Sequence, residues 1–184
     1  MFDRTELVVK AGDGGDGAVS FRREKFVPFG GPDGGDGGDG GDVVIIADSS
    51  VTSLRVFKQK RLFTAGSGKD GRGKRQHGRK GENLILRVPV GTVVSYKTQI
   101  GSDALIADLE QPGQQAVVAK GGKGGLGNTH FASSTSQAPR IAQKGEVGEE
   151  HAIILELKLI ADVGIIGYPN VGKSTLLGGF SSQA

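Results

Sequence analysis

The tract from Pro32 to Asp42 reads P-DGG-DGG-DGG-D, and it constrains the fold of this chain more than any other stretch. Aspartate recurs at every third residue, from Asp33 to Asp42. An α-helix repeats after about 3.6 residues and a strand after about 2, so neither places these aspartates on one side. Polyproline II has about three residues per turn. In that conformation the carboxylates follow one edge, and the glycine edges allow close approach of another backbone.

Three other tracts repeat this spacing or a looser form of it. Gly12–Gly17 reads GDGGDG, Lys120–Gly127 reads KGGKGGLG, and Gly66–Gly81 is a looser, basic tract. We predict that these tracts pack side by side as extended rods, because their backbone N–H and C=O groups must be paired once buried. Lys120 and Lys123 take the place of aspartate in the same period. We therefore expect them to lie near an aspartate edge.

Other interpretations of the glycine tracts stay open. A flexible linker is the usual role of glycine-rich sequence, although linkers rarely carry a charged residue at every third position. Gly37–Ile45 fits one calcium-binding nonapeptide, but a β-helix of that type needs several stacked repeats. Gly12–Gly17 and Gly122–Gly127 match G-x-G-x-x-G. No helical pattern follows either match, so a dinucleotide site is disfavoured.

Short apolar segments between and after the glycine tracts predict β-strands. They are Glu6–Lys10, Val43–Ala47, Leu84–Val88, Thr92–Tyr96, Leu105–Leu109, Gln115–Ala119 and Ile153–Leu159. The segment Leu54–Phe63 carries apolar residues among Lys and Arg. Short strands with Gly/Pro turns are typical of a sandwich or barrel. The predicted fold class is therefore mainly β, with a glycine-rich polyproline II bundle on a β-barrel or sandwich over residues 1–158.

Positive charge is concentrated in one segment. Arg55–Lys80 holds ten of the 23 basic residues and a single acid, Asp70. Such an excess indicates a polyanionic partner, with a solvated basic loop as the alternative. The residues predicted to face nucleic acid are Arg72, Lys74, Arg75, Arg79 and Lys80.

Composition excludes several other classes of protein. The chain has no cysteine, which rules out disulfides and thiolate metal sites and fits a reducing, cytoplasmic location. Its apolar stretches are interrupted by charge, so no membrane span is expected. His77, His130 and His151 are scattered along the sequence, and we interpret each as structural or solvent-facing.

The pattern changes after residue 158, where a short apolar strand leads into Gly167-x-x-x-x-Gly172-Lys173-Ser174. This is the spacing of a phosphate-binding loop that precedes a helix. Backbone N–H groups of such a loop surround the phosphates, Lys173 reaches the β- and γ-phosphates, and the Ser174 hydroxyl binds Mg²⁺. We predict that residues 159–184 begin an α/β P-loop domain.

Taken together, these motifs resemble the Obg family of ribosome-associated GTPases. The resemblance rests on Phe21–Phe26 with Gly30–Gly35, on Gly121–Asn128, on Gly145–Glu149 and on Asp162–Ser174. It implies a glycine-rich domain of packed polyproline II rods on a β-barrel, followed by a Ras-like G domain. It also implies a cytoplasmic monomer that binds GTP or GDP with Mg²⁺, hydrolyses GTP slowly and acts in assembly of the large ribosomal subunit.

In such a protein the nucleotide would contact Gly167, Tyr168, Pro169, Asn170, Val171, Gly172, Lys173, Ser174 and Thr175. The sequence stops ten residues after Ser174. We therefore expect the 184-residue chain to lack hydrolysis and to bind GTP poorly, in contrast to a longer parent. Two alternatives remain: a module that binds RNA or the ribosome without nucleotide chemistry, and a structural glycine-rich protein without a ligand.

Overall fold

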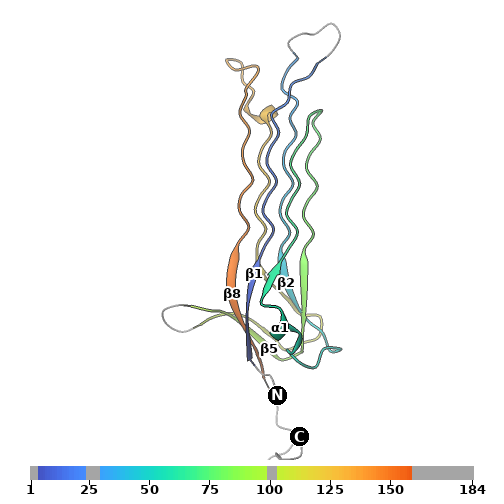
Figure 1. The fold of residues 1–184 in the computed structure, drawn as a ribbon, viewed down its shortest axis with the longest axis vertical. Coiled ribbons are helices and arrows are strands. Elements are labelled where there is room, and N and C mark those ends of the chain that lie inside the picture. Colours follow the sequence, from blue (N-terminus) through green and yellow to red (C-terminus); the bar gives the residue numbers. More distant parts are fainter. Residues whose placement is uncertain (1–3, 24–29, 99–102, 159–184) are drawn as a thin grey trace, which may run out of the picture.

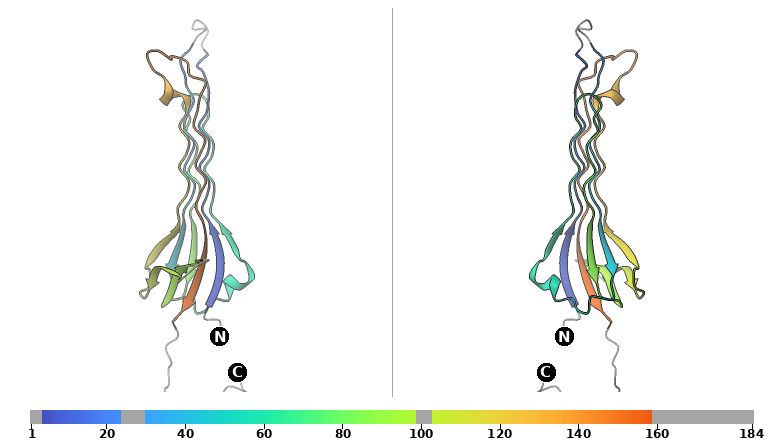
Figure 2. Two further views of the ribbon diagram at one scale, coloured as in Figure 1. Left: turned by 90° about the vertical axis from the view of Figure 1, so that its left-hand side faces the viewer. Right: turned by 90° about the vertical axis from the view of Figure 1, so that its right-hand side faces the viewer.

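The computed structural model describes residues 4–23, 30–98 and 103–158 of the chain. Figure 1 shows a long molecule in which the strands gather at one end and extended segments run side by side away from them. We call the strand-bearing end the base, the parallel extended segments the shaft, and the opposite end the distal end. The two turned views of Figure 2 show the same division.

Two sheets form the base within the described residues. The first has the strand order β3-β1-β8-β5-β6, with β3 Leu62–Thr64, β1 Arg4–Lys10, β8 Glu150–Leu157, β5 Thr92–Tyr96 and β6 Ala104–Leu109. The second has the order β4-β2-β7, with β4 Leu84–Val88, β2 Val43–Ala47 and β7 Gln115–Ala119. Two short helices complete the elements, α1 Val56–Gln59 at the base and the 3₁₀-helix η1 Asn128–Phe131 near the distal end.

The hydrophobic core lies between these sheets. Strand β2 shows the alternation of a sheet with one covered face, since Val43, Ile45 and Ala47 are buried while the residues between them are half-buried. Strand β8 instead buries three consecutive residues, Ile153 to Leu155. It is central in its sheet, between β1 and β5. Each fully buried aliphatic side chain contributes about 1.5–3 kcal/mol relative to exposure, so this core anchors the shaft.

Six extended segments of the described residues make up the shaft. We number them rod 1 (residues 11–22), rod 2 (30–42), rod 3 (65–73), rod 4 (75–83), rod 5 (120–127) and rod 6 (140–149). Their hydrogen bonds run between rods and recur at every third residue. The glycine tracts therefore form one ordered bundle with the period of polyproline II, as predicted, and the flexible-linker alternative is wrong.

Rods 1, 2 and 5 form the inside of the shaft. Gly15 N–H donates to Gly38 O at 2.8 Å, Gly37 N–H donates to Gly125 O at 2.8 Å, and Gly125 N–H donates back to Gly15 O at 2.9 Å. Each of these rods is bonded to at least two others, and its Asp-Gly-Gly or Lys-Gly-Gly triplets contain two glycines each. The outer rods 4 and 6 have one glycine per triplet, at Gly78 and Gly145 for example, because solvent covers their other edges.

The predicted strands agree closely with the observed ones. Val43–Ala47, Leu84–Val88, Thr92–Tyr96 and Gln115–Ala119 are confirmed at both ends. Strand β8 begins three residues earlier than predicted and ends at Leu157, while Leu159 lies outside the described residues. The segment Leu54–Phe63, to which the sequence pattern assigned no element, contains α1 and the start of β3. Phe57 of α1 is buried, and its ring meets the Phe63 ring edge-on with 5.6 Å between the ring centroids. Tertiary packing therefore stabilises α1 and β3, which the local sequence pattern did not indicate.

Candidate functional site

The predicted phosphate-binding loop lies outside the described residues. This holds for Gly167, Tyr168, Pro169, Asn170, Val171, Gly172, Lys173, Ser174 and Thr175, including the predicted Mg²⁺ ligand Ser174. The described chain reaches residue 158 just after β8, at the base. The candidate site that the structure does describe is therefore the shaft and its distal end.

The aspartates of rod 2 accept hydrogen bonds from the backbone of rod 5. Gly121 N–H donates to Asp42 Oδ1 at 2.8 Å and Gly124 N–H donates to Asp39 Oδ1 at 2.9 Å. Closer to the distal end, Gly127 N–H donates to Asp36 Oδ1 at 2.7 Å. Rod 1 repeats the arrangement toward rod 6, where Gly145 and Gly148 donate to Asp16 and Asp13. The period of three therefore supplies an acceptor for every third N–H of a neighbouring rod.

The lysines of rod 5 lie beside the aspartate edge, as predicted, because Gly121 and Gly124, which directly follow them, donate to Asp42 and Asp39. Lys120 and Lys123 flank the glycines that donate to aspartate, but neither forms an ion pair with a described residue. Both side chains are exposed. A buried backbone N–H needs an acceptor, whereas a lysine can stay hydrated at little cost. The carboxylates consequently bind the backbone.

The basic segment Arg55–Lys80 is split between the two ends of the molecule. Arg55 and Arg61 lie beside α1 and β3 at the base. The predicted nucleic-acid residues Arg72, Lys74, Arg75, Arg79 and Lys80 lie on rods 3 and 4 and on the turn between them. Within the described residues, all five are exposed and none forms an ion pair. Only the part of the segment after β3 forms the hairpin of rods 3 and 4, and this part carries all five predicted residues.

The turn of this hairpin has a strained backbone. Lys74 has φ 61° and Arg75 has φ 55°, which are left-handed values in residues other than glycine. Such a conformation costs about 1–3 kcal/mol at each residue. The Arg75 N–H donates to Asp33 O at 2.7 Å, and the Arg72 N–H donates to Gln76 O at 2.8 Å. These bonds hold two adjacent basic residues at the end of the rods.

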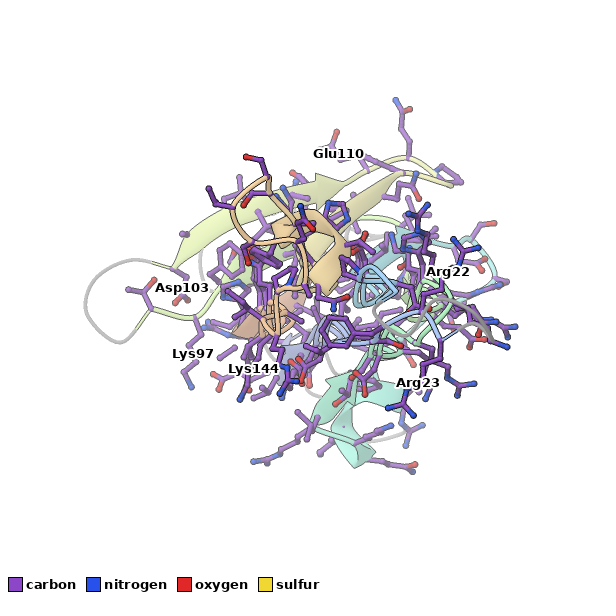
Figure 3. All side chains as sticks on the ribbon, turned by 90° about the horizontal axis from the view of Figure 1, so that it is seen from above. Arg22, Arg23, Lys97, Asp103, Glu110 and Lys144 are labelled. Carbon is purple, nitrogen blue, oxygen red and sulfur yellow. The ribbon has the colours of Figure 1, made fainter. Side chains whose placement is uncertain are left out.

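A basic cavity adjoins the turn. It has a volume of about 550 Å³ and is lined by Arg22, Arg23, Gly31, Pro32, Asp33, Lys74 and Arg75. In the end-on view of Figure 3, Arg22 and Arg23 lie on one side of the molecule, and Lys144 of rod 6 lies on the other. Four cations around one carboxylate give the cavity a net positive charge, so it suits an anionic group such as a phosphate.

Two histidines meet the same carboxylate near the distal end, which the sequence spacing did not reveal. His130 Nε2 lies 3.0 Å from Asp36 Oδ2, and His77 Nδ1 lies 3.4 Å from the same oxygen. His77 Nδ1 also accepts the Asp36 N–H at 3.2 Å. Burial favours the protonated carboxyl, but the Gly127 N–H and His130 outweigh it and hold the pKa of Asp36 below the usual value for aspartate.

The lowered pKa of Asp36 predicts a local loss of protection in acid. The ionised carboxylate stabilises the folded layer above the unfolded-state pKa, and this contribution is lost as pH falls through the lower folded-state pKa. We expect exchange protection of the Gly127 amide to fall as the solution is acidified below about pH 4. Amide exchange by NMR measures this. Asp36→Asn keeps an acceptor but does not titrate, so protection that still falls with pH in this variant would contradict the prediction.

Asn128 connects three parts of the distal end. It is fully buried, and its Oδ1 accepts the Gly34 N–H at 2.9 Å. Its Nδ2 donates to Ser20 O at 2.9 Å and to Pro139 O at 3.2 Å. The side chain thereby links rods 1 and 2 to the segment that enters rod 6. No composition or spacing argument singles out this residue, because its partners are distant backbone groups.

We expect Asn128→Ala to destabilise the distal end strongly. The substitution leaves the Gly34 N–H and the Pro139 carbonyl without their partners, and each such loss costs about 1–3 kcal/mol. The Ser20 carbonyl loses one of its two bonds, because it still accepts the Asp33 N–H. The free energy of unfolding in urea should therefore fall by at least about 2 kcal/mol. Ser134 is exposed, and Ser134→Ala should stay within about 0.5 kcal/mol of the parent. Equal stability of the two variants would show that Asn128 is not the link.

Two classes of site are absent from the part of the chain that the structure describes. No group of three or more histidine, aspartate or glutamate side chains there could hold a metal ion. Within the same residues, no helix has the length and apolar character needed to cross a bilayer. The candidate site therefore consists of exposed cations and ordered backbone.

Comparison with known proteins identifies the family. The GTP1/OBG family model matches residues 2–159. GTPase Obg of Dehalococcoides mccartyi (strain 195) is 61% identical over 177 residues, which is 96% of this chain and 42% of that protein. GTPase Obg of Sulfurihydrogenibium sp. is 59% identical over 96% of this chain and 50% of that protein. For GTPase Obg of Fervidobacterium nodosum the identity is 55%, over 99% of this chain and 41% of that protein.

The chain thus spans between about two fifths and half of the length of these relatives. The family match covers the base and the shaft and ends at residue 159, one residue after the last described one. The order of the glycine tracts, the packed rods and the sequence identity agree with one another, and the chain belongs to the GTP1/OBG family.

Proposed function

We propose that this chain is the N-terminal part of a GTP-binding protein that hydrolyses GTP and acts in assembly of the large ribosomal subunit. The names of its relatives support the GTPase part. The loop Gly167–Ser174 would bind the phosphates of GTP or GDP, with Lys173 contacting the β- and γ-phosphates and Ser174 ligating Mg²⁺. The polypeptide would act as a monomer in the cytoplasm.

The observation that carries the ribosomal part is the basic edge of rods 3 and 4. Its five exposed cations lie on both arms of the hairpin and on its turn, and the longer arm, from Arg75 to Lys80, extends about 16 Å at about 3.1 Å per residue. The strained turn holds Lys74 and Arg75 at the end of rods 3 and 4, where the Arg75 N–H donates to Asp33 O. Strain retained at one turn is typical of functional positions. We propose that this edge binds phosphates of ribosomal RNA.

A variant of the five residues tests this proposal. Replacing Arg72, Lys74, Arg75, Arg79 and Lys80 with alanine should weaken binding to large-subunit RNA, because each bound phosphate releases counterions. The log–log slope of affinity against salt should shrink by about 0.7–0.9 for each phosphate that the variant no longer binds. Filter binding or fluorescence anisotropy across a salt series measures the slope.

A control of comparable charge lies on rods 5 and 6. It replaces Lys120, Lys123, Arg140 and Lys144 with alanine, all of them exposed. If the basic edge is the interface, this control should retain most of the slope and affinity. An equal loss in both variants would mean that net charge alone attracts RNA, and no loss in the five-residue variant would refute the interface.

The second candidate is a module that binds RNA or the ribosome without nucleotide chemistry. It is favoured by one observation, namely that the exposed cations lie on rods 3 and 4, within the residues that the structure describes, and are far in sequence from the predicted nucleotide loop. GTP binding by a polypeptide of the relatives' full length separates the two candidates. Binding that depends on Lys173 supports the GTPase, and RNA binding without any nucleotide affinity supports the module.

A further inference from the structure

Rod 2 repeats one set of hydrogen bonds in every triplet. In addition to accepting from rod 5, the aspartates use their carbonyls toward rod 4, where Gly78 and Gly81 donate to Asp36 and Asp39 at 2.7 and 2.8 Å. The second glycine of each triplet donates to rod 3, as Gly38 N–H does to Lys69 O at 2.8 Å. Each triplet is therefore one layer of the shaft, and successive layers are equivalent.

This equivalence determines how the shaft can change length. If one rod slips by one or two residues, its glycines leave the positions where neighbouring carbonyls approach them. At Gly38, for example, an added Cβ would lie 2.3 Å from Arg79 O. A change of three residues in every rod restores all bonds in register. The shaft can therefore be shorter or longer only in steps of about 9 Å, three residues at 3.1 Å each.

We infer that the shaft is a spacer of fixed length, counted in three-residue layers, that holds the basic distal end at a set distance from the base. The rods are bonded to one another in each layer, so the distance does not depend on a flexible linker. The base is where β8 leads toward the predicted nucleotide loop. The identity of the partner at the distal end rests on the proposed function. The fixed length of the shaft rests only on its hydrogen-bonded layers.

Removing one layer from the whole shaft tests this inference. The variant lacks three residues in each rod, and the removed ranges are 12–14, 37–39, 68–70, 78–80, 122–124 and 145–147. In every rod a glycine moves into the position of the glycine that was removed. The deletion takes out four acids, Asp13, Asp39, Asp70 and Glu146, and four bases, Lys69, Arg79, Lys80 and Lys123. The net charge is therefore unchanged.

Two companion variants keep the test decisive if the deletion fails to fold. One duplicates the same six ranges, which adds a layer. The other deletes residues 37–39 alone, which puts rod 2 out of register with its five neighbours. We expect both six-rod variants to melt cooperatively and to change the maximum dimension in X-ray scattering by about 9 Å. The single-rod variant should not fold. Unfolding of both six-rod variants, or folding of the single-rod variant, would overturn the layer model.

Binding then tests whether the length matters. The shortened shaft and the unmodified shaft are each placed in a polypeptide of the relatives' full length. The affinity of each polypeptide is then measured for naked large-subunit RNA and for large ribosomal subunits. The control is the Arg79→Ala/Lys80→Ala variant, which keeps every layer of the shaft but lacks two of the cations that the deletion removes. The shortened variant should bind naked RNA as well as this control does, but it should bind the subunit at least tenfold more weakly. Equal subunit binding would overturn the spacer. If the polypeptide with the unmodified shaft binds neither RNA nor the subunit, the proposed function fails. The X-ray scattering of the six-rod variants would still test the layer model.

Discussion

Gly37→Ala is expected to unfold the shaft or to lower the free energy of unfolding by at least about 3 kcal/mol. A Cβ on Gly37 would lie 1.9 Å from Gly15 O and 2.3 Å from its carbonyl carbon. Both atoms belong to the backbone of rod 1, which is itself bonded to rods 2, 5 and 6. No side-chain rotation can relieve the overlap, so the rods would have to separate and lose several hydrogen bonds. Thermal and urea unfolding followed by circular dichroism measure the change.

Gly31→Ala is the matched control for this substitution. Gly31 lies in the same rod, and a Cβ added there would meet no atom within 4 Å. It should therefore change stability by no more than about 0.5 kcal/mol. If Gly37→Ala and Gly31→Ala melt at the same temperature, close approach of the rods is not what requires glycine in the DGG tract.

The rods themselves were predictable from the sequence because a period of three excludes the other regular conformations. The partner of the carboxylates was not. Matching Asp in one tract to Lys120 and Lys123 in another is reasonable for side chains alone, yet the structure pairs Asp39 with the Gly124 N–H. Backbone groups are the same in every residue, so a sequence pattern cannot show which of them lacks an acceptor. That information comes only from the packing of the rods.

The positions of the two histidines and the fold of the basic segment also depend on contacts between residues far apart in the sequence, which a local pattern cannot show. His77 and His130 are far apart in the sequence and meet at Asp36 only because rods 2, 4 and 5 are neighbours. Every third residue of Gly66–Gly81 has a partner on another rod, but the sequence did not indicate the turn at Lys74 and Arg75 that divides this tract into two rods. Strands, in contrast, depend on local alternation, and four of the seven predicted strands have the observed bounds.

Lys173→Ala is expected to abolish tight GTP binding in a polypeptide of the relatives' full length. The lysine of a phosphate-binding loop neutralises the β- and γ-phosphates, and its position after Gly172 puts it in that role here. Isothermal titration with GTP and Mg²⁺ should show affinity reduced at least about 100-fold, equivalent to about 2.7 kcal/mol. Ser174→Ala should instead make binding less dependent on Mg²⁺, since it removes only the hydroxyl that would ligate the ion.

The 184-residue chain by itself should show no micromolar binding. Tight binding by the Lys173→Ala variant would show that this loop does not hold the phosphates, and micromolar binding by the 184 residues would show that the remaining length of the relatives is not needed to complete the site.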